Sequence, residues 1–181
     1  MRQFFVILAV LFFVPCFRVA PAHAERKRHV PLPAEQLDDE AKLTLARAMV
    51  GEADWHEPDH RAIAWVLAKR FNSIETRKPG KTTFSELVAK YASPLKTKTE
   101  RTQFIQTLPW GDPTSDAYKP FAKHWAAVRE LVERWAAGDI PDPCPRAKHW
   151  GGAMDRPKVK LQPVNCGLTR NIFYEEPATR S

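Results

Sequence analysis

Apolar residues recur at helical spacing in three parts of the chain. Residues 62–68 read Ala-Ile-Ala-Trp-Val-Leu-Ala, and a helix that is apolar on all sides belongs in the middle of a core. Before it, a helix starting near residue 33 carries one apolar face, and residues 121–135 carry another that ends at Gly138. The positions that define these two faces are Leu37, Ala41, Leu45, Ala48 and Met49, then Phe121, Trp125, Val128, Val132 and Trp135.

The segments between and after these helices predict shorter elements. Thr83 and Glu86 form a capping box, which predicts a helix through Tyr91. Residues 71–81 contain Pro79-Gly80 and predict a loop, and residues 101–108 predict a turn of helix. The last 40 residues are rich in Pro and Gly and predict loops with short strands at 158–161 and 171–174. The fold class expected is mainly α (α+β).

The N-terminus has the three parts of a secretory signal. Arg2 precedes an apolar run over residues 4–17, and Ala22-His23-Ala24 follows as a cleavage site. The run is short for a helix that must cross about 30 Å of hydrocarbon, so a retained anchor is the weaker reading. We expect a signal peptide at 1–24, a flexible leader at 25–33, one domain at 34–181, and a secreted or periplasmic location without a membrane span.

Charge and cysteine content fit that location. Removing Arg2 and Arg18 with the signal leaves 26 basic and 21 acidic side chains, a net charge of +5. A basic exported protein is attracted to anionic polymers, although the charge here is dispersed. Two cysteines remain, Cys144 and Cys166. An even count in an oxidising compartment predicts a disulfide between them, worth about 3 kcal/mol in the chain-entropy model.

Glu52 is the first candidate for chemistry. It continues the apolar face of the first helix near its C-terminal end, three residues past Met49. The helix dipole and desolvation both disfavour a negative charge at such a position, and both raise a carboxyl pKa toward the range of a general acid. The alternative is that the helix frays at Gly51 and leaves Glu52 solvated.

A rival motif overlaps this region. Residues 56–60 read His-Glu-Pro-Asp-His, which matches the zinc signature in which two histidines one turn apart bind the metal. Pro58 fits only the first turn of a helix, so His56 precedes the helix and cannot share a face with His60. The simpler reading makes Asp59 and His60 surface residues of that first turn, and we expect no metal.

Two segments together resemble a known family. Residues 46–53, Ala-Arg-Ala-Met-Val-Gly-Glu-Ala, and the buried helix that ends in Val-Leu-Ala-Lys-Arg at Arg70 look like the opening of the SleB-like cell-wall hydrolases, the spore-cortex lytic enzymes and their relatives. Residues 147–151, Ala-Lys-His-Trp-Gly, and 171–174, Asn-Ile-Phe-Tyr, look like that family's closing portion. The linker at 55–58 and the two cysteines depart from the family pattern.

The resemblance implies a lysozyme-like helical domain that cleaves the β-1,4 bond between N-acetylmuramic acid and N-acetylglucosamine. It places the catalytic acid on Glu52 and needs no cofactor. A lytic transglycosylase forms an anhydro sugar without a second carboxylate, whereas hydrolysis normally uses a pair. The carboxylates available to orient a water would be Asp54, Glu57, Asp59 and Asp155, so both outcomes stay open.

Aromatic residues are the candidates for the sugar groove, because rings stack on the apolar faces of sugars. They are Trp110, His149, Trp150 and Tyr174, with core packing as the alternative for Tyr174 and Trp150. We expect a monomer that binds peptidoglycan glycan strands and not nucleic acid. The alternatives are a catalytically inactive wall-binding module and the zinc protease.

Overall fold

The structure of the chain, a computed structural model, describes residues 30–111, 116–151 and 160–177. The predicted signal peptide, 1–24, and most of the predicted leader lie outside these ranges. The leader's last residues pack on the fold, because Leu32 is 2% exposed and Asn72 Nδ2 donates a hydrogen bond to the Pro31 carbonyl. No helix in the described ranges is long and apolar enough to cross a membrane.

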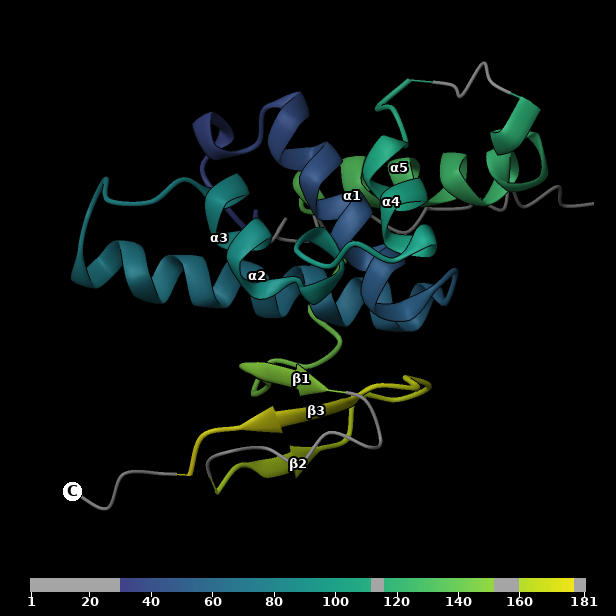
Figure 1. Cartoon of the computed structure of the whole chain (residues 1–181). Coiled ribbons are helices and arrows are strands. Elements are labelled where there is room, and N and C mark those ends of the chain that lie inside the picture. The colour runs from purple at the N-terminus through teal and green to yellow at the C-terminus, as the bar shows by residue number, and fades with distance from the viewer. Residues whose placement is uncertain (1–29, 112–115, 152–159, 178–181) are drawn as a thin grey trace, which may run out of the picture.

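The fold is mainly α with one small antiparallel sheet (Figure 1). A 3-10 turn, η1 (Ala34–Gln36), precedes α1, whose N-cap Asp38 accepts a hydrogen bond from the Ala41 amide. Two further 3-10 turns, η2 and η3, precede α4 and α5. The elements are α1 (Asp39–Ala53), α2 (Glu57–Arg77), α3 (Phe84–Tyr91), η2 (Ser93–Leu95), α4 (Glu100–Thr107), η3 (Asp116–Phe121) and α5 (Ala122–Ala136).

Helix α2 runs through the middle of the core, as its apolar sequence predicts. Trp65 is 7% exposed and the other residues of 62–68 are at most 1% exposed. The helix continues through Phe71 to Arg77, so the loop predicted over 71–81 is wrong for its first half. Phe71 is buried in the core, and no helix-breaking residue occurs before Pro79-Gly80, so the polar residues after Phe71 continue the helix on its solvent side.

The other helices follow their sequence signals. Thr83 and Glu86 form both hydrogen bonds of the predicted capping box at α3. The predicted tryptophan stripe lies on α5, where Trp125 and Trp135 are buried, so core packing is the correct reading of both rings. Gly138 adopts φ of 78° just past α5, a conformation that favours glycine, and its amide donates to the Trp135 carbonyl.

The C-terminal sheet has the strand order β1-β3-β2, with β1 (His149–Gly151), β2 (Gln162–Val164) and β3 (Ile172–Glu175) all antiparallel to their neighbours. Strand β3 matches the predicted strand at 171–174, whereas residues 160 and 161 of the other predicted strand lie just before β2. Pro163 has no amide hydrogen and sits on β2, an edge strand, where that is tolerated.

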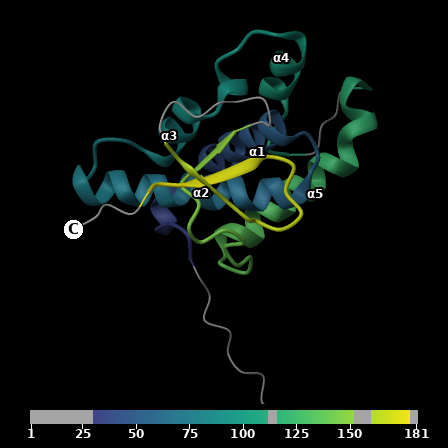
Figure 2. The same ribbon diagram turned by 90° about the horizontal axis from the view of Figure 1, so that it is seen from below.

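The sheet lies against one side of α2, and the other helices lie on the opposite side (Figure 1). Seen from below, the strands pass over the central part of α2 (Figure 2). The predicted Cys144–Cys166 disulfide is present and joins the segment before β1 to the segment between β2 and β3. The bridge therefore links the chain that enters β1 covalently to the loop that precedes β3.

A buried carboxylate attaches the sheet to the helices. Asp59, in the first turn of α2, is 0% exposed and accepts hydrogen bonds from the Arg170 and Asn171 amides at 3.0–3.1 Å and from His56 Nδ1 at 2.7 Å. The prediction that Asp59 and His60 are surface residues is wrong. Asp59 is covered by a segment that is more than a hundred residues distant in sequence, and His60 donates from Nε2 to the Asp54 carbonyl.

Replacing Asp59 by Ala should lower the free energy of unfolding by about 3 kcal/mol or more, because buried amides lose a charged acceptor. The measurement is urea unfolding, with hydrogen exchange at the Arg170 and Asn171 amides as the local readout. Glu57→Ala is the matched control, since Glu57 is exposed and pairs with Arg61 on the helix surface, and it should cost less than about 0.5 kcal/mol. Equal losses in both variants would contradict the role given to Asp59.

Candidate functional site

Glu52 lies in the last turn of α1, where η2 and β1 both reach it. The helix continues to Ala53, so Glu52 is not on a frayed end, and its side chain is half-buried. Its Oε1 accepts a hydrogen bond from the Ser93 amide at 2.9 Å, and its Oε2 accepts one from Trp150 Nε1 at 3.3 Å. Donors from two different elements therefore fix the direction of the carboxyl group.

Gly51 allows one of these donors to come close. A Cβ atom at Gly51 would lie 2.3 Å from Pro94 Cβ and 2.7 Å from Pro94 Cγ, distances that real side chains do not adopt. Pro94 is buried within η2, directly after Ser93, and its ring cannot swing away. The pair Gly51-Glu52 thus has a physical basis: the glycine admits the turn whose amide binds the neighbouring glutamate.

Trp150 is held in place by Arg70 of α2. The Arg70 guanidinium lies 5.3 Å from the Trp150 ring centroid and 4.5 Å from that of Tyr91, both within cation–π range. Its Nε donates to the Lys148 carbonyl, and its Nη2 donates to His149 Nδ1. Arg70 therefore connects α2, α3 and β1 behind the indole that binds Glu52.

His149 faces Arg70 rather than Glu52. Its Nδ1 accepts from Arg70, and its Nε2 lies 3.5 Å from a Glu176 carboxylate oxygen. Burial, followed by the positive charge of Arg70, lowers the pKa of His149. A neutral ring matches the geometry, because Nδ1 can accept a hydrogen bond only when it carries no proton.

The remaining predicted binding residues lie apart from this contact. Tyr174 is 8% exposed on β3, opposite His149, and lies on the other face of the strand from Phe173, which belongs to the hydrophobic core. Trp110 is half-buried against the hydrophobic core, and its carbonyl accepts from Arg129 of α5. Of the predicted site residues, Trp150 contacts Glu52 directly, and His149 is connected to Trp150 through Arg70. Sequence reasoning missed Ser93 and gave no role to Arg70, although Arg70 ends the quoted motif.

The other candidate carboxylates are engaged elsewhere. Asp54 pairs with Arg101, Glu57 pairs with Arg61, and Asp59 binds the segment before β3. Asp155 lies outside the described residues. Asp54 and Glu57 are exposed and Asp59 is fully buried, so among the four acids of residues 52–59 Glu52 is the half-buried one.

The zinc motif does not form the helix that it requires. Helix α2 begins at Glu57 with Pro58 in its first turn, and His56 is the N-cap with extended backbone. His56 Nδ1 binds Asp59 and His60 Nε2 binds the Asp54 carbonyl, so the two rings have separate partners. Among the described residues, no group of three or more His, Cys, Asp or Glu side chains is placed to hold a metal ion.

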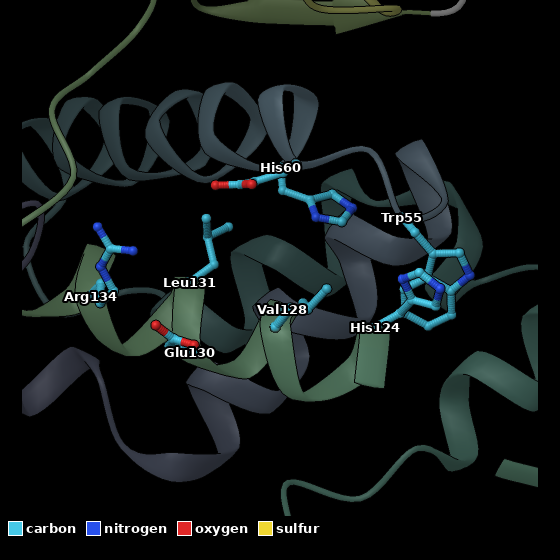
Figure 3. A pocket seen from close by; sticks show the side chains of 9 residues that line it. Trp55, His60, His124, Val128, Glu130, Leu131 and Arg134 are labelled. Atoms are coloured by element: carbon cyan, nitrogen blue, oxygen red, sulfur yellow. The ribbon is translucent and has the colours of Figure 1, made fainter. Parts of the chain in front are cut away.

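A hollow separate from the Glu52 contacts lies between the start of α2 and α5. It has a volume of about 330 Å³, with Trp55 and His124 at one end and Glu130 and Arg134 at the other (Figure 3). The Trp55 ring stacks on His124 at 5.5 Å between centroids, and Val128 and Leu131 supply apolar surface. His60 also lines it, and burial lowers the pKa of that histidine. The stacked rings of Trp55 and His124 form part of the wall of this hollow.

Gly51→Ala should destabilise the fold by about 1–3 kcal/mol, because the added methyl group forces η2 away from α1. Exchange of the Ser93 amide should become faster, since that amide loses its bond to Glu52. Urea unfolding and amide hydrogen exchange measure the two effects. Gly111→Ala is the control, because a Cβ there meets nothing within 4 Å. Unchanged Ser93 exchange in Gly51→Ala would overturn this account of the glycine.

Comparisons with known proteins identify no relative of this chain. No protein-family model matches it, and no curated protein and no solved structure matches it. The resemblance to SleB-like hydrolases therefore rests on the quoted segments of this sequence, and function has to be argued from the contacts of Glu52.

Proposed function

We propose that this protein is an exported peptidoglycan-cleaving enzyme, a lytic transglycosylase in which Glu52 is the general acid and base. The observation that carries the proposal is the pair of hydrogen bonds from Ser93 and Trp150 to the two Glu52 oxygens. The segments that resemble the family's opening and closing portions meet at this pair.

The proposed reaction needs one titrating group. The Glu52 carboxyl donates its proton to the glycosidic oxygen as the bond from that oxygen to the muramic acid C1 breaks. The resulting carboxylate then accepts the proton of the sugar's own C6 hydroxyl, whose oxygen closes onto C1 to form the anhydro ring. The reaction consumes no water, because the new bond from C1 to the C6 oxygen replaces the bond from C1 to the glycosidic oxygen. Glu52 regains its proton and returns to its starting form.

Anhydro formation is preferred to hydrolysis because of the contacts of the neighbouring acids. A hydrolytic glycosidase normally uses a second carboxylate to activate water or attack the sugar. Asp54, Glu57 and Asp59 are each bound to other groups, and the fourth candidate, Asp155, lies outside the described residues. A mechanism that recruits the substrate's hydroxyl fits this arrangement better than one that recruits a second side chain.

The cell envelope is the location that this proposal requires. The substrate lies outside the cytoplasm, and the N-terminal sequence predicts export. The Cys144–Cys166 disulfide supports an oxidising compartment. Peptidoglycan glycan strands are the proposed partner of the protein.

Glu52→Gln should lower lytic activity by at least about a hundredfold, the usual scale of general acid–base catalysis. The measurement is zymography and turbidity loss on purified peptidoglycan. Glutamine keeps an oxygen for the Ser93 amide, so the fold should survive, and urea unfolding checks this. Glu57→Gln is the control, because it removes an exposed carboxylate in the same region.

Equal clearing by wild type and Glu52→Gln would overturn the assignment of Glu52. Sedimentation with the wall without release of soluble fragments by the wild type would point instead to the wall-binding module.

A further inference from the structure

A pocket with an excess of positive charge lies between the C-terminal end of α2 and the short helix α3, which is drawn above α2 in Figure 1. It has a volume of about 380 Å³, and four cationic side chains line it without an acidic one: Arg77, Lys78, Lys81 and Lys90. Its apolar surface comes from Ile74, Leu87 and the ring of Tyr91, which is 38% exposed. We refer to it as the α2–α3 pocket.

The charges of this pocket are not neutralised as they are elsewhere. Lys42, Arg61 and Arg101 each face a carboxylate. By contrast, Lys78, Lys81 and Lys90 form no ion pair within the part of the chain that the structure describes, and all are exposed. Glu75, nearby in α2, accepts a hydrogen bond from the Gly80 amide and does not line the pocket. Clustered like charges repel one another, so an anionic ligand would relieve that repulsion.

The pocket is connected to Glu52 through a series of contacts. Tyr91 and Arg77 also line a neighbouring hollow of about 280 Å³, which contains Arg70, Lys148 and His149 together with Glu176, the carboxylate that pairs with Lys148. Arg70 lies against Trp150, and Trp150 donates to Glu52. The side branches of a polymer bound at Glu52 would therefore meet Arg70 and Arg77 of α2 before they reach the α2–α3 pocket.

We propose that the α2–α3 pocket binds the carboxylates of the stem peptides carried by the glycan strand, an inference that rests on the proposed function. A stem peptide attached to a glycan strand bound at Glu52 can extend past Trp150 and Arg77 to the pocket. An anionic polymer that is not attached to the glycan would not be aligned with Glu52 in this way. The Arg77 guanidinium donates to Ser73 through Nε and Nη2, so it does not present its full fork to a phosphate. The separate ammonium groups of Lys78, Lys81 and Lys90 can each pair with a separate carboxylate of a stem peptide.

The test measures sedimentation of the Glu52→Gln chain with insoluble peptidoglycan, so the wall stays intact. Coupling the stem-peptide carboxyls to glycinamide should weaken binding about tenfold at low salt, with a smaller effect at high salt. Adding Lys81→Glu and Lys90→Glu should weaken binding to native wall about tenfold, with no further loss on amidated wall. Lys119→Glu with Lys123→Glu is the control, because both positions are exposed and the charge change is the same.

The control pair should bind native wall within about twofold of the parent and should lose about tenfold on amidated wall. Native-wall binding by Lys81→Glu/Lys90→Glu equal to that of the control would overturn the pocket. A full loss on amidation in that variant would also overturn it, because the carboxylates would then be recognised elsewhere. Loss only after removal of wall-linked phosphate polymers would assign the pocket to phosphate and contradict the proposal. Binding in this assay does not require cleavage, so it stands apart from the test of Glu52.

Discussion

The buried carboxylate of Asp59 is the interaction on which the site depends. Its oxygens bind two consecutive amides immediately before β3, and β3 in turn pairs with β1. Trp150 is carried on β1, opposite Phe173, so its position over Glu52 follows from that pairing. The N-terminal end of α2 also favours a negative charge in its first turn. The Asp59 carboxylate therefore holds the sheet in the position from which Trp150 donates a hydrogen bond to the Glu52 carboxylate.

The two carboxylates differ in burial and partners, and this difference separates their roles. Asp59 is fully buried and each of its oxygens is used by amides or by His56. Glu52 is half-buried, at the junction of α1, η2 and β1. A group that must exchange protons with a substrate needs access, and a group that holds a chain segment needs exclusion of water. Gly51 contributes to the position of Glu52, because it allows η2 to approach closely enough for the Ser93 amide to donate to the carboxyl group.

Local signals in the sequence were sufficient for much of the fold. The capping box at Thr83, the first-turn proline at residue 58 and the stripe on α5 are all determined by neighbours within a few residues. The end of α2 was missed because polar residues after Phe71 look like a loop, although nothing there stops a helix. The burial of Asp59 depends on partners 111 and 112 residues away, and the donation by Ser93 depends on one 41 residues away, which no local pattern reveals.

Mass spectrometry of the soluble fragments released from purified peptidoglycan tests the central claim most directly, because it reports the bond cleaved and the fate of the proton together. A single acid/base at Glu52 that uses the sugar's own hydroxyl predicts fragments ending in anhydromuramic acid, 18 Da lighter than the reducing sugar because one water is missing. Fragments with ordinary reducing ends would contradict the transglycosylase mechanism, and the absence of released glycan fragments would contradict the enzymatic function itself.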